Sequence, residues 1–149
     1  MKVIVSSAFQ APAELIWTLV KKSATLVYVT KGVLAFTGSS TFPEQWQQGH
    51  TVDSSLRFFG WLPGWRHQIT FVKIDDDQRI LSTNEGGGLV SVWNHQIRVV
   101  ADAEGISRYV DEVDIRAGIV TPLVWGYAQC LYRYRQWRWK SLLASSLVV

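Results

Sequence analysis

Residues 93–116 read WNHQIRVVADAEGISRYVDEVDIR, two runs of alternating apolar and polar residues joined by the turn-forming segment 102–105. Two such runs on either side of a short turn predict a β-hairpin. If Val99 pairs with Ser107 across the turn, antiparallel geometry places three further pairs opposite each other on one face. These pairs are Ile97 with Tyr109, His95 with Asp111, and Trp93 with Val113.

The face that carries His95 and Asp111 is expected to be the concave, apolar one. The alternate positions of the second run hold Arg108, Glu112, Asp114 and Arg116, which belong in water. A carboxylate beside an imidazole in an apolar cavity suits a general acid/base pair or a polar anchor for a ligand. The alternative is a mutually satisfied buried pair that holds the strand register. A register shift of two residues would leave the pair in contact diagonally.

Outward from this hairpin, the chain predicts an antiparallel meander. Short, turn-rich connections such as Asp75-Asp76-Asp77 and Gly86-Gly87-Gly88 separate successive strands. The strands are expected over residues 51–59, 66–74, 78–85, 89–101 and 106–116.

The two ends of the chain differ from this meander. Residues 2–9 predict a first strand, and residues 11–22 a short amphipathic helix with Pro12 near its start. Residues 25–37 fit either strand or helix, and 39–49 predict a loop. Residues 120–145 predict one long helix with Pro122 in its first turn. The fold class is therefore α+β, a curved antiparallel sheet wrapped around a long C-terminal helix.

The composition describes a folded domain with a large apolar interior. Of 149 residues, 48% are apolar and only 18% are charged, which excludes a disordered chain and favours a single domain over residues 1–149. Eight Trp, six Phe and five Tyr would line any space that the core leaves unfilled.

Cysteine and histidine usage argues against metal and redox chemistry. Cys130 is the only cysteine and is expected to be a small core residue, so neither a disulfide nor a zinc site is predicted. The three histidines lie at no ligand spacing, and we expect no cofactor. With no secretory or membrane-spanning pattern, we expect a cytoplasmic protein.

Several segments resemble the START-like helix-grip superfamily, especially the small bacterial ligand-binding proteins related to polyketide cyclases. They are 11–17 (APAELIW), 93–98 (WNHQIR), 107–115 (SRYVDEVDI) and 134–137 (YRQW). The resemblance implies one or two short helices after the first strand, and a hydrophobic pocket between the sheet and the last helix. It implies no reaction, because this fold hosts many functions. An acidic residue expected in strand 78–85 is replaced by Ser82 or Thr83.

The aromatic residues suggest a ligand wall and a second surface. We predict a wall of Trp93, Ile97, Tyr109, Val113, Tyr127 and Tyr134. Segment 61–65, WLPGW, is read as a loop whose Trp61 and Trp65 form a lid or a membrane contact, or tuck under the sheet edge.

The last helix has two apolar stripes. Helical spacing groups one stripe toward the sheet, and a second nearly opposite. The second, with Trp125, Tyr132 and Trp139, is a candidate homodimer surface or membrane contact, unless it packs against the first helix or residues 25–37. Basic residues crowd this helix, but no nucleic-acid motif accompanies them, so nucleic-acid binding is not expected.

Three functions remain open from the sequence. The first is binding of a lipid-like or aromatic small molecule, with His95 and Asp111 as polar anchor. The second is a cyclase, dehydratase or hydrolase with His95 as base and Asp111 orienting it. The third is an interaction protein that uses the second stripe.

Overall fold

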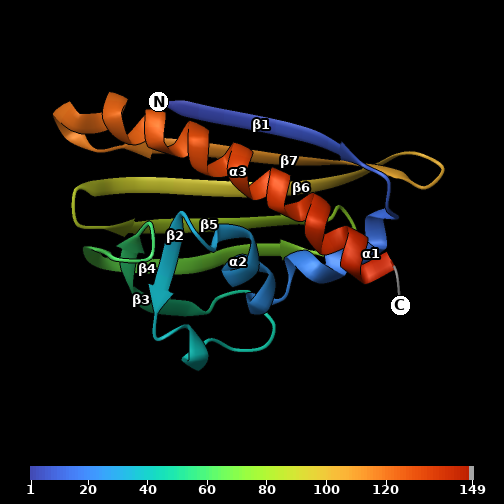
Figure 1. The fold of residues 1–149 in the computed structure, drawn as a ribbon, viewed down its shortest axis with the longest axis horizontal. Helices are drawn as coiled ribbons and strands as arrows, with labels where there is room; N and C mark the ends of the chain where they lie inside the picture. The colour runs from blue at the N-terminus through green and yellow to red at the C-terminus, as the bar shows by residue number, and fades with distance from the viewer. Residues whose placement is uncertain (148–149) are drawn as a thin grey trace.

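The computed structural model describes residues 1–147 and has seven strands, three α-helices and two short 3-10 helices (Figure 1). In chain order these are β1 (Lys2–Phe9), α1 (Ala13–Val20), α2 (Ser23–Thr30), β2 (Leu34–Thr37), η1 (Ser39–Thr41), β3 (Thr51–Phe58), β4 (Leu62–Asp75), β5 (Ile80–Gly87), β6 (Val90–Ala103), β7 (Ile106–Arg116), η2 (Gly118–Val120) and α3 (Thr121–Leu147).

All seven strands form one antiparallel sheet in the order β1-β7-β6-β5-β4-β3-β2. Strands β3 to β7 follow one another as the predicted meander, β2 extends it at one edge, and β1 closes the far edge by pairing with β7. The sheet curls, and α3 lies across its inner face (Figure 1). The predicted fold class, a curved sheet wrapped on a long C-terminal helix, is confirmed.

The segment that the sequence left open, residues 25–37, divides into two elements. Its first half belongs to α2, and its second half contains β2, which pairs with β3. Gly32 stands between them with φ +101°, a conformation that glycine adopts without steric cost. A Cβ there would also lie 3.0 Å from the Tyr134 hydroxyl. The glycine thus lets the chain turn sharply beneath α3.

The segment from Trp61 to Trp65 is a hairpin and not a loop, which corrects the sequence prediction. Leu62 begins β4 and pairs with Phe58. Pro63 has no N–H to donate, and it lies where β4 has β3 on one side but pairs with β5 only from Gln68 onward, an edge position at which proline is tolerated. Trp61 caps the hairpin and is 70% exposed, whereas Trp65 packs on the Phe58 ring with 5.3 Å between centroids.

The β6–β7 register differs by two residues from the predicted one. Val99 pairs with Tyr109 instead of Ser107. The strands continue to Ala103 and Ile106, and the turn shrinks to two residues, with Gly105 at φ +70°. A register irregularity next to Ala101 accompanies this tighter turn. Because the shift is even, every side chain keeps its predicted face.

The buried face of α3 contains the second stripe, which the sequence left open as either an exposed contact surface or a packed one. Tyr132 and Trp139 are 2% and 1% exposed, and the Trp125 indole N–H donates to the Lys2 carbonyl. Cys130, which was expected in the core, is exposed instead, as is Leu123 on the same side of the helix. The predicted dimer or membrane contact through Trp125, Tyr132 and Trp139 is therefore wrong. The buried face of α3 also contains the polar residues Arg135 and Gln136. For that reason, apolar periodicity alone could not identify this face as the buried one.

Candidate functional site

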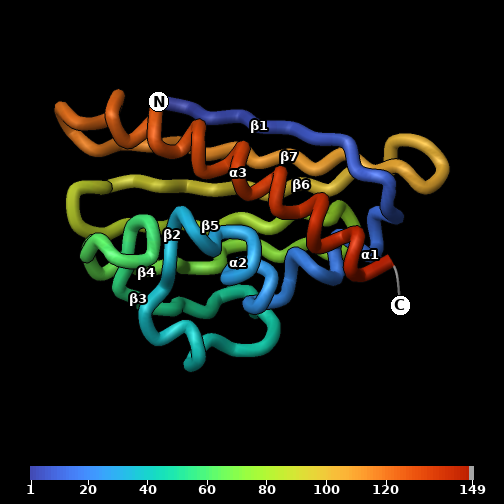
Figure 2. The backbone as a smooth tube through the Cα atoms, in the orientation of Figure 1, coloured from blue at the N-terminus to red at the C-terminus, as the bar shows by residue number. Residues whose placement is uncertain are grey.

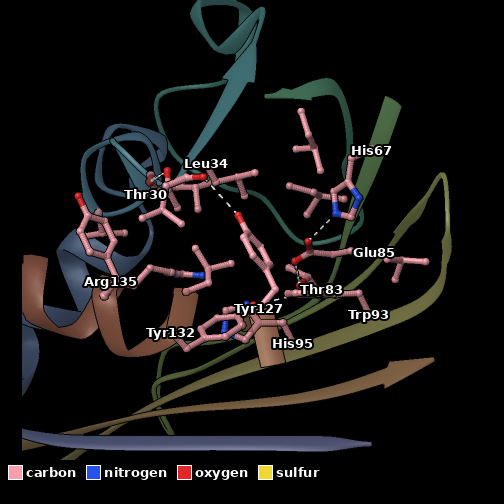
Figure 3. Close-up of a pocket in the computed structure, with 18 of the residues that line it drawn as sticks. Thr30, Leu34, His67, Thr83, Glu85, Trp93, His95, Tyr127, Tyr132 and Arg135 are labelled. Atoms are coloured by element: carbon pink, nitrogen blue, oxygen red, sulfur yellow. Dashed lines mark hydrogen bonds and ion pairs between the residues drawn. The ribbon is translucent and has the colours of Figure 1, made fainter. Parts of the chain in front are cut away.

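A cavity of about 970 Å³ lies between the sheet and helices α2 and α3. Its wall is predominantly aliphatic and aromatic, with a few polar side chains (Figure 3). Phe59, Leu89 and Leu123 line it yet are largely exposed, so they mark its mouth. They come from the β3–β4 turn, the β5–β6 turn and the start of α3, which lie at the same end of the molecule (Figure 2).

Most of the predicted ligand wall reaches this cavity. Of the predicted site residues, those that line the cavity are Trp65, Trp93, His95, Ile97, Tyr109, Tyr127 and Tyr134. Three others do not line it. Val113 packs beneath α3 in a core cluster with Ala128 and Leu131, Asp111 lies behind His95, and Trp61 points into solvent. Strand alternation correctly placed Val113 inward, but only the path of α3 determined that the helix covers it.

His95 and Asp111 form a buried imidazole–carboxylate hydrogen bond despite the altered register. His95 Nε2 lies 2.7 Å from Asp111 Oδ1, although His95 faces Val113 across the strands. The second oxygen of Asp111 accepts a hydrogen bond from the Gln136 side-chain amide at 3.0 Å. Burial opposes ionisation of this carboxyl, but the bonds from His95 and Gln136 and the charge of Arg135 outweigh it and lower the pKa of Asp111.

A second imidazole–carboxylate pair, which the sequence analysis missed, lies on β4 and β5. His67 Nε2 is 2.9 Å from Glu85 Oε2, and the Thr83 hydroxyl donates to the other oxygen at 2.6 Å. These three side chains face the cavity (Figure 3). Although burial opposes it, the hydrogen bond and charge of His67 lower the pKa of Glu85.

The alternation of residues along β4 and β5 could have predicted that this second pair points inward. His67 shares its parity with buried Ile69 and Phe71, and Glu85 shares its parity with Leu81 and Thr83. Glu85 therefore places an acidic side chain of β5 in the cavity wall, beside Thr83.

Arg135 is the third charged group that sequence reasoning missed. It projects from α3 into the cavity, is 6% exposed, and its guanidinium lies over the Tyr132 ring at 5.0 Å (Figure 3). Burial disfavours the charged form, but the carboxylate of Asp111 outweighs that effect and raises the pKa of Arg135. The cavity thus contains a permanent cation.

Two further features of residues 1–147 bear on cofactors and membranes. Nowhere in this part of the chain do three His, Cys, Asp or Glu side chains gather as metal ligands would. None of its helices combines the length and the apolar content that a bilayer crossing requires.

Solved structures of other proteins have the same architecture. The sequence matches no protein-family profile and no curated protein. The structure is similar to a START superfamily protein from Mycobacterium smegmatis, with 10% identity, TM-score 0.72 and 97% of each chain covered. It is also similar to norcoclaurine synthase from Thalictrum flavum in complex with dopamine and hydroxybenzaldehyde. Here the identity is 16%, the TM-score is 0.66, and 97% of this chain and 87% of the synthase are covered.

A major latex-like protein from Panax ginseng gives 11% identity, TM-score 0.65 and 95% coverage of each chain. The chain therefore has the START-like helix-grip fold. The resemblance drawn from its sequence motifs is confirmed at the level of the fold.

Proposed function

We propose that this protein binds a hydrophobic small molecule, lipid-like or aromatic, in its internal cavity. The observation that carries the proposal is the apolar cavity of about 970 Å³ beneath α3. Cavities that bind small molecules commonly measure about 300–1,000 Å³ and combine apolar walls with a few polar groups. Here the polar groups are the His67–Glu85 pair, His95 and Arg135.

Apolar contact would supply most of the binding energy. A ligand that buried about 300 Å² of apolar surface would gain about 7.5 kcal/mol before the costs of association. The exposed rim of Phe59, Leu89 and Leu123 offers an apolar entry route. The synthase complex with two aromatic molecules supports the proposal, because the same fold holds small aromatic ligands there.

Filling the cavity should abolish binding without unfolding the protein. Gly126 lines the cavity, and a Cβ built on it meets no atom within 4 Å. In Gly126→Phe the new ring should occupy ligand space and weaken binding of the neutral dye N-phenyl-1-naphthylamine by at least about tenfold. Fluorescence titration measures this loss, and native mass spectrometry of the gently purified wild type tests for a retained hydrophobic molecule.

Gly126→Ala is the matched control. It adds a methyl group only, should leave dye affinity unchanged, and should stabilise the helix by about 0.5–1 kcal/mol. Failure of the wild type to bind the dye, or equal affinity in wild type and Gly126→Phe, would refute a ligand cavity.

A second candidate function is catalysis by His95 and Asp111. The observation that favours it is an imidazole that lines the cavity and hydrogen-bonds a buried carboxylate. In an enzyme of the cyclase, dehydratase or hydrolase type, His95→Gln should lower turnover of the retained molecule by about 10²–10⁴-fold while changing its affinity by less than about tenfold. Product analysis by mass spectrometry measures turnover, and wild type that leaves the molecule unchanged rules the candidate out.

A further inference from the structure

Three polar groups near one another in the cavity wall make no hydrogen bond of good geometry. Within residues 1–147, five buried side-chain polar atoms have no hydrogen-bond partner, and three of them are Tyr109 Oη, Arg135 Nε and Trp139 Nε1. Tyr109 is 0% exposed, and all three residues line the cavity. Arg135 and Trp139 approach the Tyr109 oxygen, so the group that most needs a partner is the buried guanidinium. Because buried polar groups are almost always paired, a buried cation in the cavity wall without a carboxylate partner indicates a binding function.

The three groups are held by two packed elements. Arg135 and Trp139 stand four residues apart on α3, so they are neighbours on the same helical face. Tyr109 projects from β7, and its ring centroid is 5.1 Å from that of Trp139. Burial raises the pKa of the Tyr109 hydroxyl far above its ordinary value, so it is a neutral O–H donor.

The carboxylates of the cavity do not use these donors. Both oxygens of Asp111 already accept hydrogen bonds, one from His95 and one from Gln136. Glu85 is likewise bound by His67 and Thr83. Among residues 1–147, no carboxylate oxygen lies within ion-pair distance of the Arg135 guanidinium. Asp111 therefore keeps Arg135 charged from a distance, and the guanidinium has no carboxylate at hydrogen-bond distance.

We propose that Arg135, Tyr109 and Trp139 form a carboxylate-binding site, and that the ligand is an apolar molecule carrying one carboxylate group. This inference rests on the proposed ligand-binding function and specifies its ligand class. The planar guanidinium matches the two oxygens of a carboxylate, and the Tyr109 hydroxyl and Trp139 indole N–H add two neutral donors. A buried cation is costly unless it is paired and hydrogen-bonded, and a carboxylate would provide both.

The position of Arg135 also orients the ligand. It lies more than three helical turns beyond Leu123 at the mouth, about 18 Å along α3. The carboxylate would therefore enter first, and the apolar body would lie against the aromatic wall between Arg135 and the mouth.

Competition between an acid and an alcohol of equal chain length tests the site. Lauric acid and 1-dodecanol are used to displace N-phenyl-1-naphthylamine from the wild type at neutral pH. The acid should bind about 10- to 100-fold more tightly than the alcohol, the range expected for hydrogen bonds to a charged group. Carbon-13 NMR of carboxyl-labelled lauric acid should show that binding lowers the pKa of its carboxyl group.

Three variants test which residue causes the preference for the acid over the alcohol. Arg135→Met should bring the acid-to-alcohol ratio to within about twofold of one while leaving alcohol affinity unchanged, and it should not lower the melting temperature. Tyr109→Phe removes one donor with little change in volume and should reduce the ratio by about fivefold. Arg133→Met is the control, because Arg133 is exposed and bonds only Gln129, and it should keep the wild-type ratio.

The possible results distinguish failure of the carboxylate-binding site from failure of the proposed ligand-binding function. Equal binding of acid and alcohol by the wild type overturns the carboxylate site but leaves a hydrophobic carrier. An acid preference that persists in Arg135→Met, or unfolding of that variant with a normal ratio in Tyr109→Phe, also overturns the site. Absence of binding by dye, acid and alcohol alike removes both.

Discussion

Replacing Asp111 with alanine should lower the free energy of unfolding by about 3–5 kcal/mol, the usual cost of removing one partner from a buried ion pair. Asp111 has no exposed surface, and its two oxygens hold His95 and Gln136. It also provides the compensating charge for Arg135. The variant would leave a buried cation and two buried donors without their carboxylate. Urea unfolding followed by circular dichroism measures the loss.

The Asp111 carboxylate should also make the free energy of unfolding of the wild type depend on pH. Because folding lowers the pKa of Asp111, the folded protein binds fewer protons than the unfolded chain at acidic pH. Its contribution is therefore present above the unfolded pKa of about 3.9 and is lost as the pH falls through the folded value. Asp111→Ala should flatten the decline of stability below about pH 4, and Glu85 and Asp76, whose pKa values are also lowered, should contribute to the slope that remains.

Asp114→Ala is the control for this prediction. Asp114 lies on the same strand but is partly exposed, and its ion pair is a 3.8 Å contact with the terminal amino group. Such a pair contributes little, so the change should stay within about 0.5 kcal/mol. If Asp111→Ala cost no more than Asp114→Ala, the His95–Asp111–Gln136 cluster would not stabilise the fold.

Two tryptophans of α3 that stand two residues apart, Trp137 and Trp139, should differ sharply when each is replaced by alanine. Trp139 is 1% exposed and packs its ring against those of Phe9 and Tyr109, at centroid distances of 6.3 and 5.1 Å. Removing it should destabilise the protein by about 3–5 kcal/mol, the range for large aromatic residues in cores. Thermal and urea unfolding measure the effect.

Trp137→Ala provides the matched comparison. Trp137 is 58% exposed, and its ring neighbour is Tyr134 at 5.9 Å. Because it covers little of the core, its loss should change stability by no more than about 0.5 kcal/mol. A larger loss for Trp137 than for Trp139 would mean that α3 presents its other stripe to the sheet.

Local patterns of alternation, helical spacing and turn residues predicted most of the strands and helices. The predicted ranges 2–9 and 106–116 coincide with β1 and β7, and α3 begins and ends within two residues of the expected helix. Alternation also placed His95 and Asp111 on the concave face, and an error of two residues in register left that face unchanged.

The same patterns could not determine which face of α3 would be buried. This helix carries apolar residues on both sides, and its buried side includes Arg135 and Gln136. Charged and amide side chains in a core become favourable only when a partner such as Asp111, far away in sequence, reaches them. That partner is unknown until the sheet is assembled.

The sequence by itself therefore determined the order of strands and helices outside residues 25–37, the inward face of each predicted strand, and the apolar character of the interior, because these follow from short-range periodicity and turn chemistry. Only the tertiary structure decided which side of α3 meets the sheet, that His67 joins Glu85, and that Arg135, Tyr109 and Trp139 come together. The reason is physical: these contacts join residues distant in the chain, and their energies depend on burial that exists only after the sheet has curled around the helix.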